Sequence, residues 1–121
     1  QSKLMAQRAA QLDAYRNMAE MIKGLRIDSQ TTVQDFVAES DTINAALDTF
    51  IKGIRIVNTS YLPDLTVEVT AEVTLEQLIE ELKKITKRYY KGGRWHEDTF
   101  NTIRQFTRTK VVQVKGSGTV R

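Results

Sequence analysis

The most constraining feature of the sequence is a six-residue motif that occurs twice. Residues 22–27 read Ile-Lys-Gly-Leu-Arg-Ile, and residues 51–56 read Ile-Lys-Gly-Ile-Arg-Ile. A helical pattern precedes each copy, and alternating apolar residues come after it. Gly24 and Gly53 therefore fall where each helix must end. Glycine enters the left-handed conformation of a helix end without steric cost, so we expect both glycines to adopt it.

The motif predicts two helix–glycine–strand units, over about residues 3–37 and 41–61. The helix of the first unit spans Lys3 to Lys23, and its expected apolar stripe consists of Met5, Ala9, Leu12, Tyr15, Met18, Ala19 and Ile22. Residues 25–37 are rich in Thr, Val and Ile and predict a strand. A bend within that strand would return Phe36 to the core side.

The rest of the chain predicts a hairpin, a helix and a final strand. Residues 54–73 predict an antiparallel hairpin, whose Leu-Pro-Asp turn stands where a glycine-containing turn would be usual. Thr74 and Gln77 fit a capping box at the start of a helix that ends near residue 90. Ser40 or Asp41 is expected to cap the helix before Gly53. Residues 94–106 fit either a short helix or an ordered loop, with Trp95, Phe100, Ile103 and Phe106 towards the core. Residues 109–114 predict a short strand, and residues 115–119 a tail.

The order α-β-α-β-β-α-(α)-β predicts one α+β domain over residues 1–121. We expect a three- to four-stranded antiparallel or mixed sheet with helices packed on one face. A chain of 121 residues is long enough to bury one core. The sequence contains no cysteine, which excludes disulfides, thiolate metal sites and cysteine nucleophiles.

The residues offer little chemistry, and we expect a protein that is not an enzyme. The single histidine, His96, lies beside Glu97 and Asp98, where a metal or general-base role is conceivable. A solvated loop residue is the simpler interpretation, because one histidine without a second ligand or a nucleophile satisfies no catalytic template. The sequence therefore predicts no catalytic residue, no cofactor site and no metal site.

Charge is distributed unevenly along the chain. Residues 1–82 hold seven Lys or Arg against 13 Asp or Glu, whereas residues 83–121 hold 11 against two. Residues 83–110 form a basic and aromatic extension, and its candidate interaction surface consists of Lys87, Arg88, Tyr89, Tyr90, Lys91, Arg94 and Trp95. Aromatics beside cations can stack bases or sugars while the cations hold phosphates. The same aromatics can equally well cover the end of the sheet.

One stretch resembles a known family. Residues 9–36 combine an alanine-rich helix containing Tyr15-Arg16, a closing Gly24, and a Ser/Thr-rich segment ending in Asp35-Phe36. This order is similar to the opening of a family of small bacterial outer-membrane lipoproteins that includes the flagellum-associated lipoprotein FlgP. The resemblance covers about residues 5–78. It implies an outer-membrane-anchored, periplasm-facing protein whose lipidated cysteine would precede residue 1, without enzymatic activity, and in some members a part of rings around the flagellar motor.

The expected function is a structural or assembly role in the cell envelope. An acidic first part and a basic last part can bind head to tail, which closes a ring or extends a filament. This hypothesis pairs the four cations of the candidate surface with acidic positions such as Asp13, Glu20, Glu39 or Asp41. The alternative is a module that binds nucleic acid or polysaccharide through residues 87–95, with nucleic acid the less favoured partner.

Overall fold

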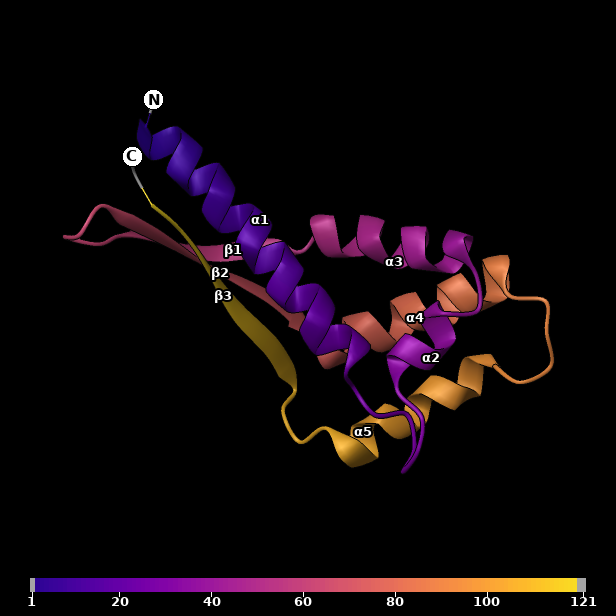
Figure 1. The fold of residues 1–121 in the computed structure, drawn as a ribbon. Coiled ribbons are helices and arrows are strands. Elements are labelled where there is room, and N and C mark those ends of the chain that lie inside the picture. The colour runs from indigo at the N-terminus through magenta and orange to yellow at the C-terminus, as the bar shows by residue number, and fades with distance from the viewer. Residues whose placement is uncertain (1, 120–121) are drawn as a thin grey trace.

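A computed structural model describes residues 2–119, which form a three-stranded antiparallel sheet with helices packed on one face (Figure 1). The elements in chain order are α1 (Ser2–Lys23), α2 (Val33–Val37), α3 (Asp41–Lys52), β1 (Arg55–Tyr61), β2 (Thr66–Thr74), α4 (Leu75–Tyr89), the 3-10 helix η1 (Glu97–Thr102), α5 (Ile103–Phe106) and β3 (Val111–Thr119). The α+β class and the antiparallel sheet predicted from the sequence are confirmed.

The sheet has the order β1-β2-β3, so the hairpin β1–β2 is continued by the last strand of the chain. On β2, Val67, Val69, Ala71 and Val73 are buried beneath the helices, as their alternation predicted. Residues on the opposite face of the sheet are joined by polar contacts. Lys115 Nζ lies 3.4 Å from Glu68 Oε1, and Gln113 Nε2 donates to Glu72 Oε1 at 2.7 Å.

Strand β3 is longer than predicted, because the expected tail at residues 115–119 belongs to it. Gly116 and Gly118 lie on its buried face, opposite α1. A Cβ at Gly116 would overlap the backbone of Ala10 and Ala14, and one at Gly118 would overlap the carbonyl oxygen of Ala6. Glycine is required here by the close approach of a helix to a strand.

The buried stripe of α1 differs from the predicted one. It consists of Ala6, Ala10, Ala14, Met18 and Ile22, all at most 2% exposed. Among the predicted members, Met18 and Ile22 are buried and Tyr15 and Ala19 are partly buried. Met5 is 69% exposed, Leu12 is 67% exposed and Ala9 is exposed. The reason is packing: alanines let the helix backbone approach the glycines of β3, whereas larger side chains on that face would hold the helix away from the sheet.

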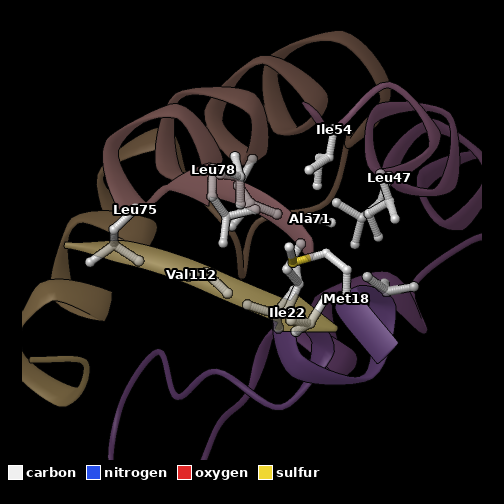
Figure 2. Packing of buried hydrophobic residues seen from close by; sticks show 14 of the residues in the cluster. Met18, Ile22, Leu47, Ile54, Ala71, Leu75, Leu78 and Val112 are labelled. Carbon is white, nitrogen blue, oxygen red and sulfur yellow. The ribbon is translucent and has the colours of Figure 1, made fainter. Parts of the chain in front are cut away.

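The large apolar side chains gather where α1, α3 and α4 meet the inner end of the sheet. Figure 2 shows Met18 and Ile22 of α1 near Ala71 of β2 and Val112 of β3, with Leu47 of α3 and Leu78 of α4 closing the same core. The core therefore lies at one end of the sheet. At the other end, alanines of α1 pack against the glycines of β3 beside Val67 and Val69 of β2.

The strand predicted over residues 25–37 is wrong, because this segment forms a tight turn followed by α2. Arg26 and Thr32 form an isolated antiparallel bridge around the turn. The carboxylate of Asp35 accepts a hydrogen bond from the Thr32 amide at 2.9 Å, which caps the new helix. Val33, Phe36 and Val37 are buried at helical spacing, so Phe36 needs no bulge to reach the core.

The two copies of the motif share a helix end but differ in the structure after it, a tight turn in the first copy and a strand in the second. Helix α1 ends at Lys23 and α3 ends at Lys52, immediately before the two glycines. Neither glycine has a positive φ, and Gly53 has φ −92°, so the predicted left-handed conformation is wrong. Both helices close with an ordinary right-handed turn, for which the added Cβ of alanine has room at Gly53.

Side chains of α1 also cover the outer edge of β3. Asp13 Oδ2 accepts a hydrogen bond from the Ser117 amide at 2.9 Å, and Asn17 Nδ2 donates to the Lys115 carbonyl at 2.8 Å. These two groups are among those that an added strand would need, so the side chains of α1 occupy part of this edge of the sheet.

We expect Gly116→Ala to destabilise the domain by about 1–3 kcal/mol, the typical cost of forcing a group into a packed region. The urea midpoint should fall while the urea dependence of the unfolding free energy stays unchanged. Gly93→Ala is the matched control, because nothing lies within 4 Å of its added Cβ. Equal stability of the two variants would show that α1 does not lie this close to β3.

We also expect the contribution of Asp13 to depend on pH. The Ser117 amide, and then Arg16, lower the pKa of Asp13 below its ordinary value of 3.8. A lowered pKa means that the stabilisation is present above the ordinary value and is lost as the pH falls through the folded value. Asp13→Ala should therefore cost about 1 kcal/mol or less near pH 7 and almost nothing near pH 2. A stability difference that is independent of pH would contradict this assignment.

Candidate interaction surface

Four cations gather where α4 ends and the chain turns towards η1. We call Lys87, Arg88, Lys91 and Arg94 the basic corner. All four are exposed, and among residues 2–119 none of them forms an ion pair. The last turn of α4 favours cations because of the partial negative charge at a helix C-terminus. That local effect accounts for Lys87 and Arg88, whereas Lys91 and Arg94 lie beyond the helix.

Two of the three aromatics predicted for this surface belong to the core. Trp95 is 3% exposed, and its ring lies 5.4 Å from that of Phe36 and 6.2 Å from that of Phe100, measured between ring centroids. Tyr90 is partly buried and meets Phe36 edge to face. We call Phe36, Tyr90, Trp95 and Phe100 the aromatic cluster. Of the two interpretations that the sequence left open for Trp95, stacking on a ligand or covering the end of the sheet, its burial supports the second.

Tyr89 is the one residue of the predicted aromatic trio that is exposed, at 38%, and the guanidinium of Arg88 lies 5.9 Å from its ring centroid. The guanidinium of Arg94 covers the Trp95 ring from outside at 4.7 Å. A row of stacked bases or sugars needs several exposed rings, and Tyr89 is the one exposed ring of the trio beside the basic corner. Its geometry thus suits an anionic partner bound through charge rather than stacking.

Hydrogen bonds join the basic and aromatic extension, residues 83–110, to the rest of the domain. Trp95 Nε1 donates to Glu39 Oε2 at 3.2 Å, Thr102 Oγ1 donates to the Ile27 carbonyl, and Arg104 Nη2 donates to Glu76 Oε2 at 2.7 Å. Hydrogen bonding from Arg104 lowers the pKa of Glu76. Phe106, which was predicted to face the core, is 45% exposed. Nothing in the sequence indicated that Glu39 accepts a hydrogen bond from Trp95, because there it is only an acidic residue that precedes the Ser40 cap of α3.

The acidic positions expected to meet the basic corner do not form one surface. Asp13 binds the Ser117 amide and Arg16, and Glu39 binds Trp95 beside the basic corner itself. Asp41 begins α3, whose antiparallel packing against α4 places it at the same end of the molecule. Glu20, exposed on α1, is the remaining candidate, and no ion pair involving it is found among the described residues.

An open groove of about 750 Å³ lies along the surface where α3 and α4 meet, and a second hollow of about 680 Å³ adjoins it towards the basic corner. Phe50 lies along it, Glu76 and Glu80 line one end, and Arg88 lines the other. The charge along the groove thus changes sign, because α4 has an acidic start and a basic end.

Within residues 2–119 the structure contains no group of three or more His, Asp or Glu side chains placed to hold a metal ion. His96 is exposed, and its amide donates to Thr99 Oγ1 at 2.9 Å at the start of η1. None of the described helices combines the length and apolar character needed to cross a membrane.

The single tryptophan gives a direct test of the aromatic cluster. We expect Trp95 fluorescence in the folded protein to be blue-shifted and weakly quenched by acrylamide, because the indole is buried. Glu39→Leu should destabilise the domain by about 1–3 kcal/mol, since it leaves the indole N–H buried without an acceptor. Glu39→Gln keeps an acceptor and serves as the matched control. Strong quenching in the native state would place Trp95 on the surface instead.

Comparison with known proteins gives one match. The family model described as LPP20 lipoprotein matches residues 1–74, which is more than half of the chain and ends with the last residue of β2. Neither a curated protein nor a solved structure matches the chain. Elements α4, η1, α5 and β3, and with them the whole basic corner, lie outside the matched residues.

Proposed function

Since the chain belongs to the LPP20 lipoprotein family, we propose that it is a non-enzymatic lipoprotein domain of the cell envelope with a structural role in an assembly. The observation that carries the assembly role is the basic corner. Its four cations are exposed and form no ion pair within the described residues, although the chain has acidic side chains in plenty. Such a cluster is available to an anionic surface on another molecule.

In this proposal the partner is a second copy of the chain, and it contributes one exposed acid, Glu20. In the proposed contact, Lys87 and Arg88 of one copy approach Glu20 on α1 of the next. The two surfaces differ, so the contact is heterologous and repeats as a ring or a filament. Charge attraction of this kind is screened over about 10 Å at 0.1 M salt, so assembly should weaken as salt is added.

We place this assembly at the periplasmic side of the outer membrane, with the lipid anchor on the N-terminal side of α1. A ring associated with the flagellum is the specific form that the family resemblance suggests. Fractionation of cell membranes tests the first part, and loss of a ring around the motor in a strain lacking the gene tests the second. Recovery of the protein in the inner membrane would contradict the outer-membrane location. Unaltered motors in that strain would contradict the flagellar ring.

We expect the double variant Lys87→Glu with Arg88→Glu to abolish self-association on membranes in low salt, because both cations of the contact become acids. Adding Glu20→Lys should partly restore it by reversing the partner's charge. Sedimentation of the protein tethered to lipid nanodiscs measures both effects.

The matched control is Arg108→Glu with Lys110→Glu, which makes the same charge change at exposed positions in the loop before β3. It should leave assembly unchanged. If both double variants lose self-association equally, the effect comes from net charge. If Lys87→Glu with Arg88→Glu assembles as well as the original protein, the proposed contact is excluded.

A further inference from the structure

The turn of the β1–β2 hairpin carries exposed apolar side chains. We call Tyr61, Leu62 and Leu65 the hairpin tip; they are 55%, 39% and 60% exposed. In Figure 1 the hairpin projects beyond α1 at the end of the molecule where the N-terminus lies. Leu4 and Met5, on the first turns of α1 at this end, are 50% and 69% exposed.

Leu65 has a backbone conformation that disfavours leucine. Its φ is 67°, the one positive value among the non-glycine residues that the structure describes. The loop is closed by hydrogen bonds from the Leu62 amide to the Thr66 carbonyl at 2.8 Å and from the Leu65 amide to the Leu62 carbonyl at 3.2 Å. Glycine or asparagine usually occupies such a position, because a branched side chain there is strained. A strained residue with an exposed apolar side chain suggests that the side chain itself is used.

Polar groups lie at the tip and next to it. Tyr61 Oη donates to Gln7 Oε1 at 3.1 Å, and Lys3 Nζ lies 5.7 Å from the Tyr61 ring centroid. Asp64, the acid of the turn, accepts a hydrogen bond from the Thr66 amide at 3.1 Å. The two leucines thus flank the apex of the turn, and a tyrosine and a lysine lie beside them. This combination suits the boundary of a bilayer, where tyrosine and lysine place their polar ends among headgroups.

We propose that the hairpin tip inserts into the surface of a lipid bilayer. The inference rests on the proposed lipoprotein role, in which the acyl chains precede α1 and lie at the same end as the tip. A second protein suits the tip less well. Three partly exposed side chains offer on the order of a few hundred Å², and a stable protein interface buries about 1,200 Å² or more.

Leu65→Gly separates this role from stability. Glycine relieves the strain at φ 67°, so the melting temperature should rise by roughly 4 °C. Removal of the leucine side chain should lower binding to vesicles about tenfold. The probe is vesicles of phosphatidylethanolamine with a minor share of phosphatidylglycerol, and bound protein is measured by flotation. A variant that is more stable but binds as tightly as the original protein would overturn the proposal.

Phe106→Ser is the matched control, because Phe106 is 45% exposed on α5, away from the hairpin (Figure 1). It should leave vesicle binding unchanged. If it reduces binding as much as Leu65→Gly does, the contact is general hydrophobic adsorption and the proposal fails.

A depth probe tests the position of the tip directly. The chain has no cysteine, so Leu62→Cys and Arg108→Cys each accept one environment-sensitive fluorophore. Vesicles should brighten the label at position 62 and leave that at position 108 unchanged; equal responses would contradict insertion.

Sedimentation without lipid separates the tip from a protein contact. Leu65→Gly should leave the sedimentation coefficient unchanged, and an altered one would assign the tip to a second copy and overturn the lipid assignment. Lys87→Glu with Arg88→Glu should leave vesicle binding intact, so that failure of the assembly contact and failure of the membrane contact are distinguishable.

Discussion

The structure depends on the close approach of one helix to one strand. Gly116 and Gly118 remove the side chains that would separate β3 from α1, and the alanines of α1 complete the contact from the other side. Because the backbones are this close, Asp13 and Asn17 reach over the edge of β3 and bind its outward amide and carbonyl groups. The same contact therefore fixes the position of α1 and covers part of one edge of the sheet.

Features that depend on neighbouring residues were predictable from the sequence. The Thr74–Gln77 capping box, the Ser40 cap of α3 and the alternation of β2 are present as expected, because each involves groups a few residues apart. The segment 25–37 was misread because β-branched residues suggested a strand. There, one local hydrogen bond from Thr32 to Asp35 and burial at helical spacing favour a helix. Intrinsic strand preference was weaker than that local cap.

Features that depend on distant residues were not predictable. The apolar stripe of α1 was assigned to its larger side chains, since nothing near the helix shows that its partner strand carries glycines almost 100 residues later. The same glycines made β3 look like a tail. At the candidate surface, the run of cations was recognisable from composition. The burial of Trp95 could not be recognised in this way, because it depends on Phe36 and Glu39 from another part of the chain.

The contact between α1 and β3 joins the first and last elements of the chain, with hydrogen bonds between residues 98 and 104 positions apart. Contacts of such long sequence separation form late and slow the folding of small domains, because a long loop must close before they contribute. During synthesis β2 is made before β3, so the alanine stripe of α1 can meet β2 earlier than it meets the glycines of β3. The segment matched by the family model, residues 1–74, therefore does not include the strand whose glycines face the alanines of α1.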